Sequence, residues 1–312
     1  GLNTSSLRPW ASIISNGAAA SGPDRFYEKT IAKAVEAVAQ GGRRGGALIE
    51  LRNSDHPDIL FFIDKKKLIP PPTISQIYKQ LRSELRQESG EDSMTYKKRL
   101  LKLAEQKYGE QYALYMEKQN YLKNTNVTVL AMPGFMEAVE SRSFFPAIFQ
   151  DKIWTGSIYD PRHVVLDEKT GMPKVNRLTK EPVFEEYSVD IKKFPEAVQA
   201  ARNLKNAIVE ITDRYVKVRG HFFAPEVFQR VIEGMRDSGE PGIGFYETIN
   251  AGNANNHVYD LNTCNPCGEQ FLPAGPGKDG RFYMGNCNLS SVHAAHPDFW
   301  NPDGTYNMSQ MK

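Results

Sequence analysis

Apolar residues recur at helical spacing in three parts of the chain. Residues 24–40 follow this spacing, and Gly22-Pro23 just before them suits a helix start. The same pattern covers residues 195–218 and residues 225–237, the last of which open with Pro225 and are followed by Gly239. Each segment therefore predicts an amphipathic helix that packs one face against a core.

Short apolar runs alternate with these helical segments. We predict buried strands at residues 47–51 and in "NVTVLAM" (126–132), short helices in "HPDILFFI" and "GFMEAV", and a turn and a strand in "GEPGIGFYETIN". Residues 154–192 are rich in turn residues and predict a hairpin excursion. Near the end, "LNTCNPCGEQFLP" and "RFYMGNCNLSSV" flank the turn-rich "AGPGKDG", so we expect two extended segments that return on each other. The alternation of helices and strands indicates an α/β fold.

A polar stretch rich in lysine, glutamate and glutamine interrupts this alternation. Residues 74–122 have helical periodicity in two pieces with a break near Ser89-Gly90. We expect a helical hairpin inserted on the surface of the main domain.

Composition and charge narrow the class of protein. The chain has 312 residues, 40% of them hydrophobic, which is enough for a sizeable core, and a net charge of +2 from 39 basic and 37 acidic residues. A balanced charge gives no reason to expect binding to nucleic acid or to a membrane, and runs such as residues 59–63 are too short to span one. We expect a cytoplasmic protein. The chain opens with Gly1 and no leader, which suggests a fragment, a processed piece or one part of a split enzyme.

Three cysteines in a chain of this length do not form a disulfide framework. Cys264, Cys267, Cys287 and His293 have ligand types and an opening C-x-x-C spacing that fit tetrahedral zinc. Pro266 crowds the first pair, however, and the glycine common in zinc knuckles is missing. A thioredoxin-like dithiol fits less well because the motif continues into extended sequence. Buried cysteines that act as small apolar residues are a further reading.

Alternation along an extended segment gives another interpretation of "CNPCGEQFLP". Residues i, i+2 and i+4 project from one face, so Asn265, Cys267 and Glu269 would point together toward one small substrate. A carboxylate beside a thiol disfavours the thiolate, and a neutral thiol can instead lose a hydrogen atom. The pattern indicates hydrogen-atom chemistry assisted by a base.

Five segments, in order along the chain, resemble ribonucleotide reductase large catalytic subunits. "QGGRRGGAL" is similar to the specificity loop of the family, "HPDILFFI" to its next helix, "NVTVLAMPGFMEAV" to its Asn-x-Ser-Val strand and helix, "SGEPGIGFYETIN" to its Gly-Asp-Pro-Gly segment, and "NPCGEQFLP" followed by "GNCNLSSV" to its radical finger loop. The resemblance implies a portion of a ten-stranded α/β barrel with a central finger loop, spanning residues 1–312 and carrying the insertion at 74–122. It also implies reduction of ribonucleotides to 2′-deoxyribonucleotides by thiyl radical chemistry.

The resemblance assigns roles to individual residues. Cys267 would be the thiyl radical that takes the ribose 3′ hydrogen, and Glu269 would accept the proton of the 3′ hydroxyl. Asn265 would hydrogen-bond the ribose hydroxyls, and Cys287 would be one of two thiols that become a disulfide. Cys264 matches no functional position and is expected to be structural, and we assign no metal ligand.

The glycine loop is similar to the segment through which an effector nucleotide changes base preference. The loop comprises Gln40, Gly41, Gly42, Arg43, Arg44 and Gly45. Its flexible backbone and guanidinium groups suit a dNTP or ATP effector, although a solvated turn has the same composition. "GLNTSSLRPWASIISNGAAASGP" resembles the neighbouring effector loop.

Several family features are missing between Gly1 and Lys312. No cysteine precedes Cys264, and neither the Pro-Thr-Gly-Thr phosphate turn nor a C-terminal cysteine pair is present. The resemblance then implies missing barrel segments at both ends, a complementary reductase chain, a homodimer and an external, thioredoxin-like dithiol reductant, with a ribonucleoside di- or triphosphate as substrate.

The residues after Cys267 indicate which class of reductase the chain resembles. Gly-Glu-Gln favours the adenosylcobalamin-dependent class, and a metal-dependent subunit with a separate radical-generating subunit is the alternative. A non-catalytic zinc protein and a regulatory nucleotide-binding module remain rivals from other classes.

Overall fold

The computed structural model describes residues 1–14, 18–37, 39–40, 44–66, 81–82, 85, 90–108, 124–167, 173–175, 182–288, 290 and 293–309. Its centre is a parallel sheet in the order β1 (Leu2–Asn3), β4 (Leu48–Asn53), β5 (Thr125–Ala131) and β15 (Gly242–Phe245). The strands predicted at 47–51 and 126–132 are confirmed as β4 and β5. An α/β architecture is also confirmed, whereas the described strands form an open sheet in which ten strands and a closed barrel are not seen.

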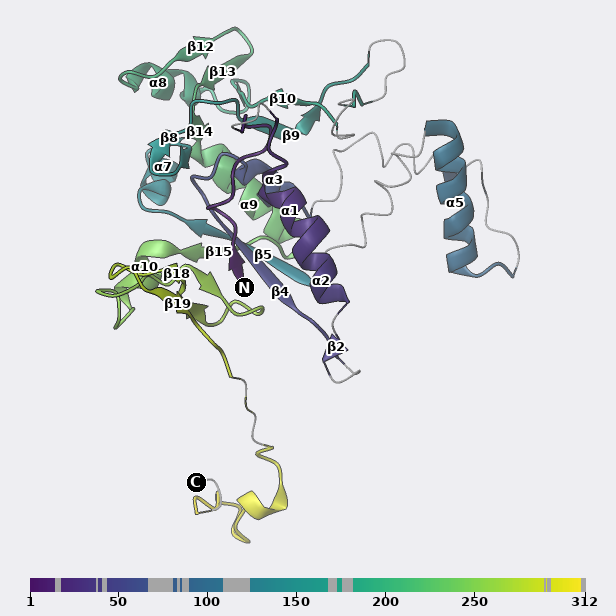
Figure 1. Ribbon diagram of the computed structural model, residues 1–312, viewed down its shortest axis with the longest axis vertical. Coiled ribbons are helices and arrows are strands. Elements are labelled where there is room, and N and C mark those ends of the chain that lie inside the picture. Colours follow the sequence, from purple (N-terminus) through teal and green to yellow (C-terminus); the bar gives the residue numbers. More distant parts are fainter. Residues whose placement is uncertain are drawn as a thin grey trace.

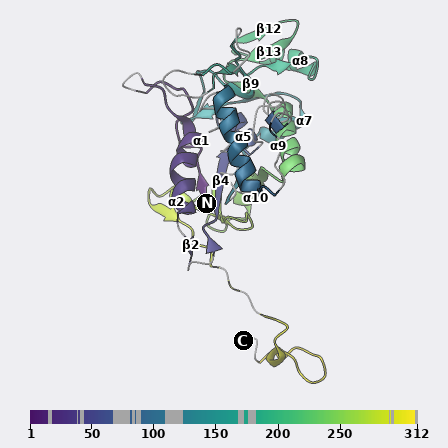
Figure 2. The same cartoon turned by 90° about the vertical axis from the view of Figure 1, so that its right-hand side faces the viewer.

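Helices cover one face of this sheet (Figures 1 and 2). A continuous helical segment consists of α1 (Gly22–Phe26), the π-helix η1 (Tyr27–Ala32) and α2 (Lys33–Glu36), which confirms most of the first predicted helix. The other helices near the sheet are α3 (Ile59–Asp64), α7 (Phe135–Glu140), α9 (Ala224–Ser238) and α10 (Tyr246–Ala251). In α9, Pro225 occupies the first turn and Gly239 ends the helix in a left-handed conformation, as the sequence predicted.

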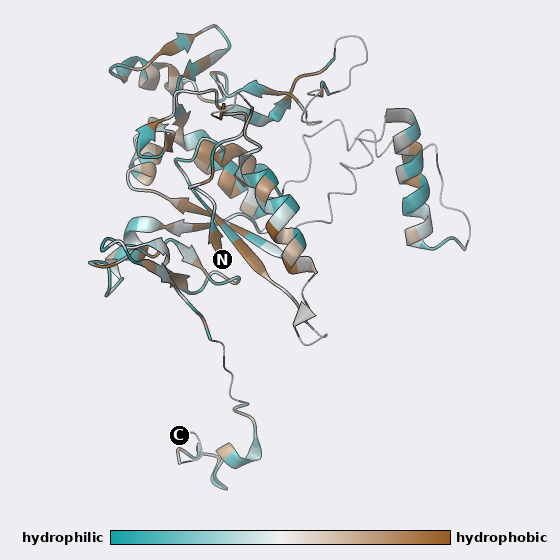
Figure 3. Ribbon diagram, viewed as in Figure 1, coloured by the Kyte–Doolittle hydropathy of each residue, from teal (hydrophilic) through white to brown (hydrophobic). Residues whose placement is uncertain are grey.

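The two faces of the sheet carry different side chains. On β5, Val127 and Val129 are buried in the main core together with residues of α3, α7 and α9. The register pairs Ile49 with Asn126 and Glu50 with Val127, so Ile49 and Leu51 project from the opposite face. Brown, apolar colour in β4 and β5 is interrupted by polar colour in Figure 3, because both strands also contain polar residues.

An excursion between α7 and α9 contains short strands and one helix. Its hairpins are β7 (Ile148–Phe149) with β8 (Lys152–Ile153), and β9 (Tyr159–Val164) with β10 (Phe184–Glu186). A three-stranded sheet has the order β11 (Val189–Asp190), β13 (Tyr215–Val218), β12 (Val209–Ile211), and β6 (Phe144–Pro146) pairs with β14 (His221–Phe223) where the excursion begins and ends. The hairpin excursion predicted over residues 154–192 is thus part of a larger one.

The helix predicted over residues 195–218 is wrong in its second half. It is confirmed as α8 (Glu196–Asn203), after which the chain turns through Asn206 with a φ of +63° and continues into β12 and β13. Residues 209–218 alternate β-branched and charged side chains, a pattern of period two that we read as part of a helix.

The predicted insertion is described only in part. Its second piece is confirmed as α5 (Ser93–Tyr108), which stands apart from the sheet in Figure 1. Residues 67–80, 83–84, 86–89 and 109–123 lie outside the described residues, so the hairpin as a whole stays a prediction.

The end of the chain holds three further small elements and a tail. β16 (Thr263–Cys264) pairs with β17 (Phe271–Leu272), and β18 (Ala274–Pro276) pairs with β19 (Phe282–Met284). A short 3-10 helix, η3 (Pro297–Phe299), follows, and Trp300 stacks on Tyr306 nearby. This last segment extends away from the sheet (Figure 1).

Candidate active site

The turn between β16 and β17 carries the predicted catalytic residues. The amide of Asn265 donates to the carbonyl of Gln270 (3.1 Å), and the amide of Gly268 donates to the carbonyl of Asn265 (2.9 Å). Gly268 has a φ of +83°, which glycine adopts without strain. The segment from Asn265 to Gln270 is therefore a hairpin turn and not the extended strand that we predicted, because these backbone bonds bend the chain back on itself.

The turn changes the relation between the three candidate residues. Cys267 and Glu269 are both exposed at the tip, whereas Asn265 is 8% exposed at its base. The Oδ1 atom of Asn265 accepts the amide hydrogen of Gln270 at 3.0 Å. Asn265 thus supports the turn through Oδ1, and its Nδ2 atom is the part suited to donate to a substrate hydroxyl.

The hairpin lies on the face of the sheet opposite α3, α7 and α9, on the same side as α10 (Figure 1). Cys264 is fully buried and forms a small apolar cluster with Ile49, Leu51 and Phe271. Burial raises the pKa of the Cys264 thiol to about 11. This cysteine is an apolar anchor for the hairpin, in keeping with the structural role expected from the sequence.

Asparagine side chains hold the hairpin at several points. Asn126 of β5 donates to the carbonyl of Pro266 at 2.7 Å, and Asn3 of β1 donates to the carbonyl of Asn262 at 2.9 Å. Asn262 in turn exchanges two hydrogen bonds with the backbone of Ala274 (2.8 and 2.9 Å). Neither Asn3 nor Asn126 could be identified from the sequence, because both contacts join segments that are far apart in the chain.

Cys287 follows β19 and is partly buried. The amide of Gly285, two residues before it, donates to the carbonyl of Pro273 (2.9 Å), which brings the segment back toward β17. Cys264, Cys267 and Cys287 are all free thiols. The zinc set is not assembled in this structure: among the described residues, which include all four of its members, no three histidine, cysteine or acidic side chains come together as metal ligands.

The predicted specificity loop is described at its two ends. β2 (Ala39–Gln40) pairs with β3 (Arg44–Gly45) in an antiparallel bridge, with Gln40 opposite Arg44. Gly41, Gly42 and Arg43 lie outside the described residues. The loop leads directly into β4, so the backbone of the predicted effector segment is continuous with the strand on which the hairpin rests.

A buried ionic network lies between β4 and the helical segments α1 and α3. Arg52 contacts Asp24 (2.5 Å) and Glu50 (2.8 Å), and Lys65 contacts the same two carboxylates. Burial alone would raise the pKa of Asp24, but Arg52 and Lys65 hold it at about 2. Sequence reasoning missed this network, although a charge at alternate positions of a predicted buried strand was a signal for it.

The His-Pro-Asp segment fixes the chain that precedes α1. His56 Nε2 lies 3.0 Å from the carbonyl of Leu7, and Asp58 accepts the amide hydrogen of Trp10 at 2.7 Å. Burial lowers the pKa of His56 to about 3 and raises the pKa of Asp58 to about 7. Both groups therefore act as neutral or nearly neutral hydrogen-bond partners in the core.

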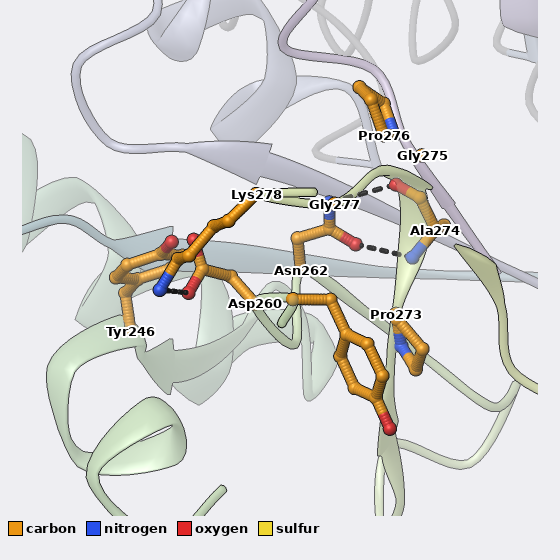
Figure 4. Close-up of a pocket in the computed structure, with 10 residues that line it drawn as sticks. Tyr246, Asp260, Asn262, Pro273, Ala274, Gly275, Pro276, Gly277 and Lys278 are labelled. Carbon is orange, nitrogen blue, oxygen red and sulfur yellow. Dashed lines mark hydrogen bonds and ion pairs between the residues drawn. The ribbon is translucent and has the colours of Figure 1, made fainter. Parts of the chain in front are cut away.

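A small, open pocket lies beside the base of the hairpin (Figure 4). Lys278 reaches across it to Asp260 (3.1 Å), and Asn262 and Ala274 form its wall. Burial and a hydrogen bond to Asp260 raise the pKa of Tyr246 to about 12. None of the predicted catalytic residues lines this pocket. Two of the residues that do, Asn262 and Ala274, hydrogen-bond to each other and hold the base of the hairpin.

Comparison with known proteins decides the family. The family model described as "Ribonucleotide reductase, barrel domain" matches residues 1–310. The chain belongs to this family. The resemblance to reductase large subunits is thereby confirmed at the level of the family.

A relative supports the same assignment over a shorter stretch. The chain is 33% identical over 75 residues to the "Ribonucleoside-diphosphate reductase subunit alpha" of Synechocystis sp. (strain ATCC 27184 / PCC 6803 / Kazusa). The aligned stretch covers 24% of this chain and 9% of that protein. In the described part of the barrel domain, no helix combines the length and the apolar character needed to cross a membrane.

Proposed function

We propose that this barrel domain reduces ribonucleotides to 2′-deoxyribonucleotides, with Cys267 as the thiyl radical. The contrast between two cysteines three positions apart carries the proposal. Cys264 is sealed under the hairpin, whereas Cys267 is exposed at the tip of a turn that is tied to the sheet. A thiol that takes a hydrogen atom from a substrate has to be accessible and held in place.

The chemistry assigned to the turn balances in atoms and electrons. The Cys267 thiyl radical takes the hydrogen atom from C3′ of the ribose, and Glu269 accepts the proton of the 3′ hydroxyl. The 2′ hydroxyl then leaves as water. A pair of thiols, one of them Cys287, supplies two protons and two electrons and becomes a disulfide: one proton leaves with the 2′ hydroxyl in the water, and the other, with both electrons, forms the new C2′–H bond. Glu269 returns its proton to the 3′ oxygen, and Cys267 returns the hydrogen atom to C3′. Asn265 orients the ribose through its Nδ2 atom.

A second part of the proposal concerns the source of the radical on Cys267. We propose adenosylcobalamin, and a separate metal-dependent radical-generating subunit is the alternative; either supplies the one-electron oxidation of the thiol. The exposed Cys267 is accessible to both. Turnover that requires adenosylcobalamin supports the first, and turnover that requires an added subunit supports the second.

Further partners belong to the same proposal. A second thiol for Cys287 and the phosphate turn would come from a complementary reductase chain or from further sequence. We also propose a homodimer, dNTP or ATP effectors at residues Gln40 to Gly45, a thioredoxin-like reductant and a cytoplasmic location.

Substitution of the two cysteines tests the proposal. In the reconstituted reductase, Cys267→Ser is expected to abolish formation of deoxyribonucleotide without lowering thermal stability, because its side chain is exposed. Cys264→Ala is expected to retain turnover and to lower the free energy of unfolding by about 1 kcal/mol, because it removes a buried group. Activity in Cys267→Ser would contradict the proposal. Effector binding without any turnover in the wild type would favour a regulatory module.

A further inference from the structure

The turn that carries Cys267 is fixed to the sheet at its own tip. The bond of 2.7 Å from Asn126 Nδ2 ends on the carbonyl of Pro266, the residue directly before Cys267. Asn126 and Pro266 are 140 positions apart in the chain. The bond therefore adds a contact between the tip of the turn and the sheet, and it is separate from the bonds within the turn that give the turn its shape.

The position of Asn126 follows from the alternation along β5. Its neighbours Thr125 and Val127 are buried, while Asn126 projects from the opposite, exposed face. The register places Asn126 beside Ile49, which packs on Cys264 beneath the hairpin. Asn126 therefore provides a hydrogen-bond donor at the edge of the apolar cluster around Cys264.

The remaining contacts of the hairpin leave its tip less constrained. Asn265 forms its hydrogen bonds with Gln270 and Gly268, all within the turn. The bond from Asn3 reaches Asn262, four residues before Pro266 along the arm. The contact from Asn126 is the one beside the reactive thiol.

We propose that Asn126 is a positioning residue for Cys267, which fixes the distance between the thiol and the ribose C3′ without touching the substrate. The proposal rests on the proposed function of Cys267. Transfer of a hydrogen atom requires close approach of the reacting atoms, and a misplacement of about 1 Å can cost about 100-fold in rate.

Kinetics of the complete reductase, with its radical source and reductant, test this role. In Asn126→Asp the side chain keeps its shape but has no N–H to donate, and Asn126→Ala removes the group. Both variants are expected to lower kcat by about 10- to 100-fold and to leave the KM for the ribonucleotide within about twofold. Asn124→Ala is the matched control in the segment that enters β5, because Asn124 uses its backbone carbonyl, which accepts the amide hydrogen of Leu48.

Hydrogen exchange provides a measurement that does not need turnover. Loss of one hydrogen bond at the tip is expected to speed exchange of the amides of Gly268 and Gln270 by about fivefold in both variants, and to leave the control unchanged. Unchanged exchange overturns the positioning role even if the wild-type protein is active. Faster exchange with an unchanged kcat overturns it as well. A wild-type protein without turnover counts against the proposed function itself. The exchange measurement does not depend on turnover, so it tests separately whether Asn126 holds the turn in place.

Discussion

At the scale of single residues, two neighbouring carboxylates have pKa values that are shifted in opposite directions. Asp24 and Asp58 both lie near Arg52, yet the pKa of Asp24 is lowered to about 2 while burial raises the pKa of Asp58 to about 7. Asp24 contacts Arg52 and Lys65 directly, whereas Asp58 accepts a hydrogen bond from the amide of Trp10. Direct contact with a cation, and not proximity alone, decides which carboxylate stays ionised.

Asp58 is expected to make stability fall with rising pH. An unfolded aspartate ionises near pH 4 and the folded one near pH 7, so between these values the folded state binds a proton that the unfolded state has lost. The contribution of Asp58 is fully present below about pH 4 and is lost as the pH rises to about 7, a difference on the order of 4 kcal/mol.

The variant Asp58→Asn tests this linkage. Its amide oxygen can still accept the hydrogen bond from Trp10 but does not titrate, so the fall in unfolding free energy between pH 4 and pH 7 should become smaller. Chemical denaturation at several pH values measures it, with the exposed Asp298→Asn as control. The test is the difference between the variant and the wild type, because His56, with its lowered pKa, makes stability rise with pH over much of the same range. A difference in unfolding free energy that stays constant between pH 4 and pH 7 would contradict the prediction. At the residue scale, the "HPD" segment could be recognised in the sequence. The directions in which the pKa values of His56 and Asp58 shift could not be predicted, because they depend on burial.

At the scale of elements, the hairpin and the sheet fit because small residues stand where they meet. A Cβ atom at Gly244 of β15 would lie 3.0 Å from Cζ of Phe271 and 3.3 Å from Cδ1 of Leu130. Phe271 belongs to the apolar cluster under the hairpin. Gly244 therefore leaves the space that the hairpin needs to lie on the sheet.

The variant Gly244→Ala is expected to displace Phe271 and, with it, the turn that carries Cys267. Overpacking of this kind typically costs about 1–3 kcal/mol, and turnover should fall at the same time. Gly252→Ala is the matched control, because its nearest contact would be an ordinary 3.8 Å. Thermal unfolding and kcat are the measurements. Equal behaviour of the two variants would show that Gly244 is not needed for the fit.

Elements with a strong local pattern were predictable, and the turn at Cys267 was not. Residues 22–36 and the strands β4 and β5 followed helical or apolar periodicity and are confirmed. Residues 265–270 also suited alternation, but their own backbone hydrogen bonds close a turn instead. Because both conformations suit the same short polar sequence, local pattern could not choose between them.

At the scale of the whole molecule, a second buried ionic group joins the excursion to the helices. Asp160 of β9 is fully buried and accepts hydrogen bonds from Arg230 of α9 at 2.8 and 2.5 Å. Arg230 also contacts Glu226 at 2.8 Å. In the same region, Arg162 of β9 contacts Asp64 of α3 at 2.8 Å.

The variant Asp160→Asn is expected to destabilise the domain by about 3 kcal/mol, because it removes the fully buried one of the carboxylates that compensate the Arg230 guanidinium. The excursion should also become easier to cleave, since its attachment to α9 is weakened. Thermal unfolding and limited proteolysis of residues 141–223 measure both effects, with the exposed Glu185→Gln as control. Wild-type stability in Asp160→Asn would contradict the prediction.

The sequence by itself determined the parts of this protein that local chemistry decides. It determined the helices and strands with strong periodicity and the resemblance of ordered motifs to the reductase family, and it marked Cys267 and Glu269 as candidates. These features can be predicted without knowledge of the tertiary structure, because periodicity and side-chain chemistry are properties of the segment itself.

Only the tertiary structure decided which groups are buried together. It placed Cys264 under the hairpin and Cys267 at its tip, brought Asn126 to Pro266, and buried Glu50 and Arg52 against the helices. Each of these facts depends on the register of β4 with β5 and on the face that each neighbour covers. Contacts across 140 residues leave no periodic signal in the chain, so they could not be predicted from it.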